Sequence, residues 1–472
     1  MPVTALKQDG ERNEAGIAQA VDRLKTLFGE RCSSAYSVRE QHGHTTTWIE
    51  NQMPDAVVFA ESTDEVVSAV RICNELKVPM IPFGVGSSLE GHLNAPLGGI
   101  SIDVSRMKSV LKVNAEDLDC VLQPGVTREE LNSYLRDTGL FFPIDPGAHA
   151  TMGGMASTRA SGTNAVRYGT MKDVVLGLTV VTPQGNVIKT GGRAKKSSAG
   201  YDLTRLYVGS EGTLGIITEL TIRLFGLPEA ISGGICPFPS VEAACQAVSL
   251  TIQAGVPVAR IELLNKRQVE ASNSYFKLEL EETPTLFLEF HGSESSVKEQ
   301  AELFGSIAEE FGAGTFTWTS RPEERTKLWT ARHNAYYAAQ SLRPGCKGLS
   351  TDVCVPISRL AECVTATEQD LNESGLQATI VGHVGDGNFH VIMLVDMDDA
   401  DEITKVDEFI ERLAWRAIDM EGTCTGEHGV GQGKMKYLEK EHGNDALDVM
   451  RAIKKALDPD NIMNPGKIVV AD

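Results

Sequence analysis

The chain has 472 residues and lacks the patterns that assign a protein to several common classes. Its nine cysteines are scattered and form no Cys-x-x-Cys pair, so they encode neither a zinc ribbon nor an iron–sulfur site. An odd, unpatterned set of thiols in a long chain is typical of a reducing compartment. The apolar runs are far shorter than a membrane span. The class that remains is a large globular protein with reduced cysteines.

Positively charged residues are fewer than negatively charged ones. The 44 Lys and Arg residues face 64 Asp and Glu residues, which gives a net charge of −20. This balance argues against nucleic acid and anionic membranes as partners, because both attract basic patches. The N-terminal stretch "MPVTALKQDGERNEAG" has neither an apolar core nor an Arg-rich amphipathic pattern. We therefore expect a cytoplasmic protein without a transmembrane segment.

Hydrophobic periodicity predicts two α+β regions. Residues 15–30 have the pattern of an amphipathic helix. "AVVFA" and "VPMIPF" are typical strands, and between them Ser62 and Glu65 have the spacing of a capping box that opens a helix. From about residue 236 longer helical patterns alternate with strands, which indicates a second domain. The predicted helices there are 241–254, 295–312, 357–374 and 402–420, and the predicted strand regions are 285–292 and 378–396.

Three glycine-rich segments lie in the first region. "PFGVGSSLEGH" (82–92) follows a strand but is neither a Rossmann nor a Walker A loop, because the third glycine and the Gly-Lys-Ser/Thr are missing. Such a loop is either a plain tight turn or a nest of backbone N–H groups that binds phosphate. Similar segments at 143–169 and 208–224 allow the backbone to approach a large ligand at several points. A dinucleotide is the natural candidate.

The second region contains a histidine hairpin. If "GDGN" (385–388) forms a four-residue turn, His383 lies opposite His390 on one face of the sheet, with Cβ atoms ~5 Å apart. The two imidazoles then either converge on one cation or make separate hydrogen bonds. "GEHG" supplies Glu427 and His428 as further candidates, or it is a surface turn. Two histidines and one carboxylate would leave an open position, as catalytic metal sites do.

These segments, with "GSEGTLGIITE" and the terminal "DPDNIMNPGKI", resemble the FAD-binding D-2-hydroxyacid dehydrogenases of the vanillyl-alcohol oxidase / p-cresol methylhydroxylase superfamily. The resemblance runs from about residue 50 to 470, and residues 328–360 look most like the cytochrome-type D-lactate dehydrogenase branch. It implies an α+β protein with a two-subdomain FAD-binding domain and an α+β cap domain. The boundaries that we expect are an N-terminal helical segment (1–50), the FAD-binding domain (51–228), the cap with the metal-binding hairpin (229–425) and a C-terminal segment returning to the flavin domain (426–472).

By this resemblance the first glycine loop holds the FAD pyrophosphate, and other residues line the isoalloxazine and adenine or close the site. The implied cofactor-binding residues are Gly84, Val85, Gly86, Ser87, Ser88, Pro143, Gly153, Gly154, Ser157, Gly162, Ile217 and Asn464. Some members of the superfamily attach flavin through a histidine inside the first loop. No histidine comes before His92 in this loop, so non-covalent FAD is expected.

The resemblance also assigns the histidine hairpin. His383, His390 and Glu427 match the family's ligands for a divalent ion, zinc or manganese, and His428 matches its base. A divalent ion lowers the pKa of a coordinated hydroxyl, so that His428 can take the proton while the α-hydride leaves for flavin N5. The implied reaction is the oxidation of a D-2-hydroxy acid to the 2-oxo acid, with D-lactate the favoured substrate.

Three further residues are expected near the substrate. Arg332 matches the family's carboxylate-binding arginine, with a helix-surface arginine as the alternative. Asn388 lies on the hairpin turn, and Tyr336 comes one helical turn after Arg332. The sister D-2-hydroxyglutarate dehydrogenases carry a lysine near the position of residues 349–350, whereas Lys347 is offset here. This departure counts against a second substrate carboxylate that is bound in the same way.

Other functions stay open at this point. The flavin subunit of a multi-subunit glycolate oxidase and a D-2-hydroxyglutarate dehydrogenase would share these motifs. A metal-dependent hydrolase without flavin would be colourless, and a protein that only holds flavin would need no metal cluster. No haem-binding Cys-x-x-Cys-His is present, so a dehydrogenase would pass electrons to a separate cytochrome, quinone or electron-transfer flavoprotein. The oligomeric state is open, and a homodimer is one option.

Overall fold

The computed structural model describes residues 12–45 and 49–470. The chain folds into two compact units, each built from more than one segment. They are the terminal unit (described residues up to 161, 169–227 and from 427 onward) and the central unit (162–168 and 228–426). The domain boundaries expected from the sequence stay predictions, and the predicted segment 1–50 lies partly outside the described residues.

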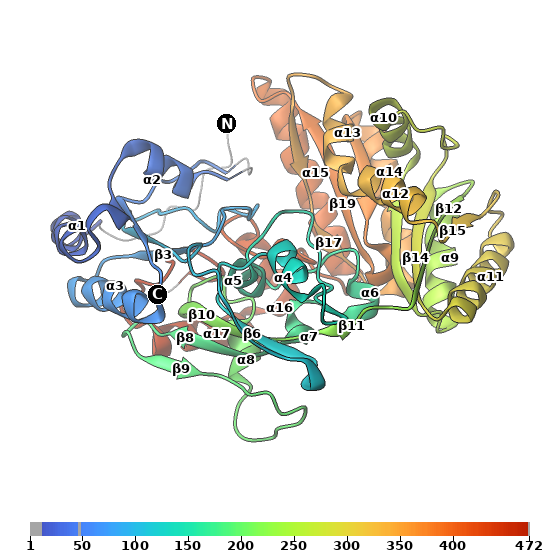
Figure 1. Cartoon of the computed structure of the whole chain (residues 1–472). Coiled ribbons are helices and arrows are strands. Elements are labelled where there is room, and N and C mark those ends of the chain that lie inside the picture. Colours follow the sequence, from blue (N-terminus) through green and yellow to red (C-terminus); the bar gives the residue numbers. More distant parts are fainter. Residues whose placement is uncertain (1–11, 46–48, 471–472) are drawn as a thin grey trace. The chain divides into compact units, whose positions relative to one another are not determined.

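A four-stranded sheet forms one layer of the terminal unit (Figure 1). Its order is β1-β2-β4-β3, with β2, β4 and β3 parallel and β1 antiparallel to β2. The predicted strand–helix–strand start is present, but β4 lies between its two strands. A later strand inserts there, and local periodicity does not encode neighbour order in a sheet. The strands are β1 (Cys32–Ser33), β2 (Ala56–Phe59), β3 (Met80–Phe83) and β4 (Ile100–Asp103).

Two long helices, α1 (Glu14–Phe28) and α3 (Thr63–Leu76), share an apolar core with this sheet. Ser62 caps α3, because its hydroxyl oxygen accepts the backbone N–H of Glu65 at 3.3 Å. The expected reciprocal half of the capping box differs. The Glu65 carboxylate accepts the backbone N–H of Glu61 at 2.8 Å, one residue before the predicted partner.

A five-stranded antiparallel sheet forms the other layer of the terminal unit, in the order β5-β6-β10-β8-β9. Its core takes in α5 and the C-terminal helix α17, and β7 pairs with β11 beside it. The strands are β5 (Val110–Asn114), β6 (Asp119–Leu122), β7 (Leu140–Phe141), β8 (Val175–Val181), β9 (Val187–Lys189), β10 (Ile216–Arg223) and β11 (Phe225–Gly226). The helices are α2 (Tyr36–Gly43), α4 (Arg128–Leu135), α5 (Met152–Thr158), α7 (Met171–Val174), α8 (Leu203–Tyr207), α16 (Leu438–His442) and α17 (Asn444–Leu457).

An eight-stranded antiparallel sheet spans the central unit, in the order β15-β12-β14-β13-β18-β19-β16, with β17 also paired to β19 (Figure 1). The predicted strand at 285–292 is confirmed as β14. The strands are β12 (Ala230–Pro237), β13 (Val258–Leu264), β14 (Thr285–Gly292), β15 (Thr317–Thr319), β16 (Lys347–Ser350), β17 (Val353–Cys354), β18 (Ala378–Gly382) and β19 (Asn388–Val395).

Helices cover both faces of this sheet, and the four predicted helical patterns are confirmed to within a few residues. Phe287 shares a core with α10, α12 and α13, whereas Phe290 on the opposite face meets Phe304 of α11, with ring centroids 6.4 Å apart. We call these the α12 face and the α11 face; α9 packs against α11, and α14 against α9. The helices are α6 (Ala165–Tyr168), α9 (Val241–Gln253), α10 (Lys266–Phe276), α11 (Glu294–Glu310), α12 (Pro322–His333), α13 (Ala335–Ser341), α14 (Leu360–Ser374) and α15 (Ala400–Asp419). Over the part of the chain that the structure describes, no helix combines the length and the hydropathy needed to cross a membrane.

The histidine hairpin has a different register from the one predicted. β18 and β19 pair Val381 with His390, so His383 is not directly opposite His390. The turn is longer than four residues, because residues 384–386 form a 3₁₀ turn that Gly387 closes at a φ of 79°. This moves the pairing by two residues. A two-residue shift keeps every side chain on its face of the sheet, so both histidines still lie on the α12 face with Val381.

All nine cysteines are free thiols, and seven of them are buried. Burial raises the pKa of Cys73, Cys120 and Cys236 to about 12. The reactive species is the thiolate. At pH 8 we expect at most two thiols per chain, Cys346 and Cys354, to react rapidly with a thiol reagent such as DTNB. All nine should react in guanidinium chloride. More than two rapid equivalents from the native protein would contradict this packing.

Candidate functional site

Two histidines of the central unit each present one ring nitrogen to a common space. His383 follows β18, and its Nδ1–H donates to the two carboxylate oxygens of Glu262 at 2.8 and 2.9 Å. His390 lies in β19, and its Nδ1–H donates to the Thr351 carbonyl at 2.9 Å. A carboxylate and a carbonyl can only accept, so Nδ1 carries a proton in both rings and Nε2 is the nitrogen that each ring can offer to an ion. The ring centroids lie 5.3 Å apart.

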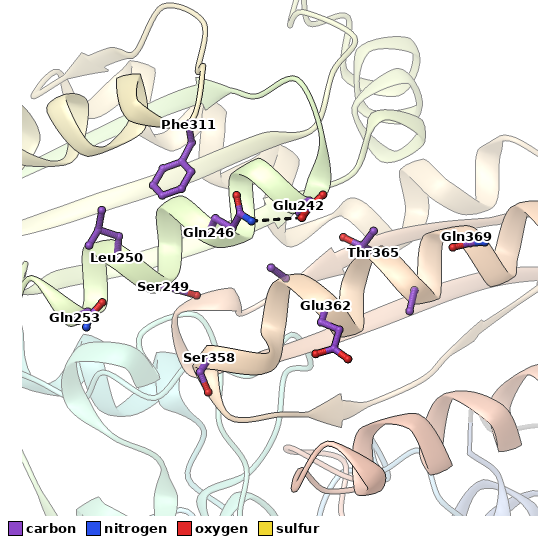
Figure 2. A pocket seen from close by; sticks show the side chains of 12 residues that line it. Glu242, Gln246, Ser249, Leu250, Gln253, Phe311, Ser358, Glu362, Thr365 and Gln369 are labelled. Atoms are coloured by element: carbon purple, nitrogen blue, oxygen red, sulfur yellow. Dashed lines mark hydrogen bonds between the residues drawn. The ribbon is translucent and has the colours of Figure 1, made fainter.

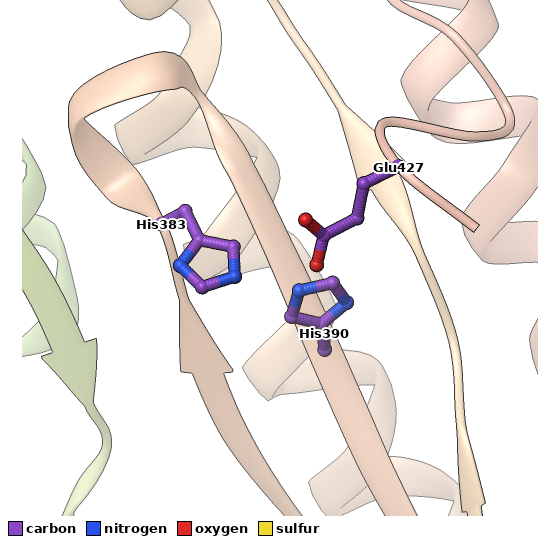
Figure 3. A group of neighbouring side chains, drawn as sticks. All are labelled: His383, His390 and Glu427. Carbon is purple, nitrogen blue, oxygen red and sulfur yellow. The ribbon is translucent and has the colours of Figure 1, made fainter. Parts of the chain in front are cut away.

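Glu427 supplies a carboxylate to the same group. It follows directly on Gly426, the last residue of the central unit. One candidate ligand atom from each of His383, His390 and Glu427 lies within 4.8 Å of the others, and Figure 3 shows the three side chains directed toward one another. Two imidazoles, each held through Nδ1, and one carboxylate suit zinc or manganese and leave coordination positions open. This donor set therefore fits a divalent ion.

Glu262 of β13 is a residue that reasoning from the sequence missed. Its side chain is fully buried, and it forms an ion pair with Nη2 of Arg332 at 2.5 Å in addition to its bond from His383. Arg332 is itself buried near the end of α12, so the helix-surface alternative is wrong. Its Nε has no hydrogen-bond partner among the described residues. A lone carboxylate inside the apolar run "VARIELL" was the signal that could have identified Glu262.

Tyr336 is not one helical turn after Arg332. The helix ends between them, because α12 stops at His333 and α13 begins at Ala335. The Tyr336 hydroxyl donates to the Gly348 carbonyl at 3.0 Å, and burial raises the pKa of this hydroxyl. The expected periodicity is thus wrong, and a substrate role for Tyr336 stays a prediction.

Asn388 is tied to Asp352, a second buried carboxylate that the sequence reasoning missed. The Asn388 side-chain amide donates to Asp352 at 2.7 Å and to the Val353 carbonyl at 2.8 Å. The Thr425 hydroxyl donates to the other Asp352 oxygen at 2.9 Å. The amide nitrogen of Asn388 is therefore engaged within the protein, and a substrate role for its carbonyl oxygen stays a prediction.

Lys347 lies away from the histidines along the sheet. In the β16–β19 pairing it is opposite Val395, five residues beyond His390. At about 3.4 Å per residue this is a displacement of roughly 17 Å along the strand. Burial lowers the pKa of Lys347. Its position agrees with the offset noted in the sequence.

In the terminal unit the first glycine loop leaves β3 and passes close to α5. A Cβ on Gly84 would lie 2.4 Å from Thr151 Oγ1, and a Cβ on Gly86, which has a φ of 73°, would lie 3.1 Å from a phenylalanine ring. These positions do not admit a side chain, so the loop presents its backbone. Val85 is 43% exposed, and Ser88 Oγ is buried with no hydrogen-bond partner among the described residues.

The other glycine segments and the C-terminal stretch are tied to this loop. The Glu211 N–H donates to the Ser157 carbonyl at 2.8 Å, which joins the third segment to α5. The Asn464 side-chain amide donates to the carbonyls of His92 and Glu211 at 3.2 and 2.7 Å, and its backbone N–H donates to Met80 at 2.7 Å. Asn464 Oδ1 is buried with no hydrogen-bond partner in the described chain.

The remaining expected FAD residues differ in their surroundings. A Cβ on Gly153 would lie 2.5 Å from a proline side chain, whereas the nearest atom at Gly154 is a threonine hydroxyl at 3.2 Å. Pro143 is buried, and Ile217 belongs to the core of the five-stranded sheet. Gly162 opens the short segment that belongs to the central unit. Exposed backbone together with buried polar atoms on several loops fits a large ligand such as FAD.

His428 lies in the terminal unit beside the first glycine loop. Its Nδ1 is 3.9 Å from the carboxylate of Glu90, a member of that loop, and Lys434 Nζ is 3.4 Å from the same carboxylate. Burial alone would raise the pKa of Glu90, but Lys434 and His428 hold it below its ordinary value. Glu90 thus keeps a negative charge next to the imidazole. Reasoning from the sequence did not predict this neighbour.

A second carboxylate fixes the loop that carries His428. Glu211, at a φ of 53°, accepts the backbone N–H groups of Val430 and Gly431 at 2.6 and 2.8 Å. A Cβ on Gly429 would come within 2.7 Å of Glu211, which explains the glycine directly after His428. The "GEHG" segment is therefore no ordinary surface turn.

An open groove lies elsewhere on the central unit, between α9 and α14. Figure 2 shows Ser249 and Leu250 on one wall and Glu362 and Thr365 on the other. Helix α9 packs against both α11 and α14, on the face of the sheet opposite to His383 and His390. The groove is therefore separate from the histidine site.

Two family models match the chain. The "FAD binding domain" model matches residues 54–191, and the "FAD linked oxidases, C-terminal domain" model matches residues 227–468. Among curated proteins, the chain is 50% identical to "Probable D-lactate dehydrogenase, mitochondrial" of Danio rerio, covering 96% of this chain and 92% of that one. It is 45% identical to "D-lactate dehydrogenase [cytochrome], mitochondrial" of Arabidopsis thaliana, covering 96% and 80%. It is 35% identical to "Glycolate oxidase subunit GlcD" of Bacillus subtilis, covering 89% and 90%.

Solved structures share the fold. Substrate-bound p-cresol methylhydroxylase superposes with a TM-score of 0.79 over 97% of this chain and 98% of that one, at 17% identity. The 4-ethylphenol oxidase of Gulosibacter chungangensis superposes with a TM-score of 0.78 over 98% and 99%, at 18% identity. The predicted α+β class and superfamily fold are confirmed. With both family models matched and relatives aligned along nearly the whole sequence, the chain belongs to the FAD-linked oxidase family.

Proposed function

We propose that this chain oxidises a D-2-hydroxy acid, with D-lactate favoured, to the 2-oxo acid, using FAD and a divalent ion. The observation that carries the proposal is the convergence of one candidate ligand atom from each of His383, His390 and Glu427, in a chain of this flavin family. The D-lactate dehydrogenase names of relatives at 50% and 45% identity support the substrate.

Different residues of the chain have separate roles in the proposed reaction. FAD would supply the hydride acceptor, and a divalent ion held by His383, His390 and Glu427 would make the substrate hydroxyl more acidic. His428 accepts the hydroxyl proton on its imidazole. Its loop is held by Glu211, and the Glu90 carboxylate beside Nδ1 stabilises the imidazolium that forms.

Arg332 binds the substrate carboxylate. One guanidinium nitrogen is committed to Glu262, and the planar fork keeps further N–H groups for a second carboxylate. The carbonyl oxygen of Asn388 accepts from the substrate, while Tyr336 contributes to the pocket wall. Lys347, displaced along β16, supports a substrate with a single carboxylate, such as D-lactate or glycolate, over 2-hydroxyglutarate.

A second candidate is the flavin subunit of a glycolate oxidase, favoured by the 35% identity to the Bacillus subtilis subunit. In both cases electrons leave to a separate acceptor, and the "[cytochrome]" in the names of the plant and yeast relatives supports a cytochrome. The fish, plant and yeast relatives are named as mitochondrial proteins. The cytoplasmic location and the homodimer expected from the sequence stay predictions.

The proposal is tested by an anaerobic absorbance spectrum of the purified protein. We expect an FAD spectrum that bleaches with D-lactate but not with L-lactate, and that no longer bleaches after a chelator has removed the ion. Released FAD should appear in the supernatant after acid precipitation, since the attachment is non-covalent. A colourless protein that FAD cannot reconstitute would overturn the flavin proposal and favour a metal hydrolase. Bleaching by glycolate alone would favour the second candidate.

His428→Ala should lower turnover by about 100-fold or more, because a general base contributes on this scale. FAD and metal content should stay at wild-type levels, since the base is not a ligand in the proposal. His442→Ala is the matched control, because this histidine at the end of α16 is 40% exposed and lies outside the site. Steady-state kinetics under saturating acceptor measures both. Near-normal turnover in His428→Ala would remove the base assignment.

Arg332→Met should raise the KM for D-lactate by about 10- to 100-fold, because a charge-assisted hydrogen bond contributes about 1.5–3 kcal/mol. The effect on kcat should be smaller. Arg321→Met is the control, since Arg321 precedes the same helix with its side chain 78% exposed. An unchanged KM in the Arg332 variant would exclude the carboxylate-binding role.

A further inference from the structure

We propose that Glu262 is a positioning residue that couples the metal ligand His383 to the substrate-binding Arg332. This inference rests on the proposed function. Glu262 belongs to β13, the neighbour of β18, and reaches His383 just past the end of that strand. One side chain therefore touches both an ion ligand and the carboxylate-binding arginine, although it is not among the three candidate ligands itself.

Both carboxylate oxygens have a partner. Oε1 and Oε2 accept from Nδ1 of His383 at 2.8 and 2.9 Å, and Oε2 also forms an ion pair with Nη2 of Arg332 at 2.5 Å. The side chains of Glu262 and Arg332 are 1% and 8% exposed, so water does not compete for these bonds. A buried carboxylate with two charge-assisted donors is stable only while both donors stay in place.

Two functions follow from this geometry. Toward the metal, Glu262 holds the proton of His383 on Nδ1 and fixes the ring plane, so that Nε2 is aimed at the ion. Toward the substrate, it holds one edge of the guanidinium and fixes the direction in which the remaining N–H groups point. The ion and the substrate carboxylate are thereby aligned through one side chain on a rigid strand.

The chemistry requires a carboxylate at this position. A glutamine has the same shape but replaces one oxygen with an NH2 group, and both oxygen positions face the Nδ1–H of His383, at 2.8 and 2.9 Å. In either orientation the NH2 group would therefore oppose the His383 donor, and the negative charge beside Arg332 would be lost. Glu262→Gln is therefore an isosteric change that should disturb both the ion and the substrate, whereas Arg332→Met removes the guanidinium and leaves the bond from Glu262 to His383.

The test measures binding of Mn²⁺ or Zn²⁺ by competition with a chromophoric chelator, on FAD-loaded full-length protein, together with KM and kcat for D-lactate. For Glu262→Gln we expect the metal Kd to rise about 10- to 100-fold, the range for losing the partner of a ligand histidine. Its KM should rise as well, at unchanged FAD absorbance. Arg332→Met should keep its metal Kd within about threefold of wild type while its KM rises.

Glu289→Gln is the matched control. Glu289 is also a buried carboxylate on the α12 face, on the adjacent strand β14, and it accepts from His291 at 2.8 Å and lies near Arg260 and Arg325. It touches no candidate ligand, so its metal Kd should stay at the wild-type value. A loss of metal affinity in both glutamine variants would mean general destabilisation and would overturn the specific role.

The double variant Glu262→Gln, Arg332→Met covers the case in which the single variant fails to fold because it leaves Arg332 buried without a counter-charge. It removes both charges, and its metal Kd should still be 10- to 100-fold weaker than that of Arg332→Met. Equal Kd values in these two proteins would overturn the inference and leave the proposed function intact. A wild-type protein that binds neither metal would overturn the metal site and this inference together.

Discussion

Carboxylates that are buried away from water must be matched by donors, and the geometry around the candidate site depends on this requirement. Glu262 contacts an imidazole and a guanidinium, and Asp352 accepts hydrogen bonds from the Asn388 amide and the Thr425 hydroxyl. Glu211 accepts hydrogen bonds from two consecutive backbone N–H groups. In each case a buried acceptor holds its donors in one direction. The candidate ligand His383 and the loop that carries the expected base His428 are therefore fixed by buried carboxylates.

Recognition through backbone groups explains how a protein with a net charge of −20 accommodates an anionic dinucleotide. The expected phosphate-binding loop offers backbone rather than lysines, and glycines at Gly84 and Gly86 bring that backbone close. Polar atoms such as Ser88 Oγ and Asn464 Oδ1 are buried there with no hydrogen-bond partner among the described residues. Recognition through main-chain dipoles needs no basic surface, so the acidic composition and the flavin fold are compatible.

Local sequence patterns predicted much of the secondary structure. Strand β14 begins and ends at the predicted residues, and α9 differs from its prediction by one residue. The two hairpin histidines were placed on a common face, since a face depends on alternation and survives a two-residue shift in register. The shift itself was not predictable, because it arises from the 3₁₀ turn that Gly387 permits. The break between Arg332 and Tyr336 was missed because nothing in "TARHNAYY" marks the end of a helix.

The hydrogen-bond partners of the site residues could not be predicted from the sequence, for a different reason. Glu262 is separated from His383 by 121 residues in the sequence, and Glu211 lies 219 residues before Val430. Such contacts are fixed by the topology of a sheet or by the return of a distant loop, and a single sequence carries no record of either. A charged residue within an apolar strand was the one local sign, and it marks a buried partner without naming it.

The C-terminal stretch completes a strand that is synthesised much earlier. The N–H of Met80 in β3 donates to the Ile462 carbonyl, the N–H of Asn464 donates to the Met80 carbonyl, and the Asn464 side chain joins two glycine segments. The strand that leads into the expected phosphate-binding loop is therefore translated long before its partners, and these bonds form only once residues 462–464 have been synthesised. During translation the loop thus lacks contacts that hold it in the folded protein.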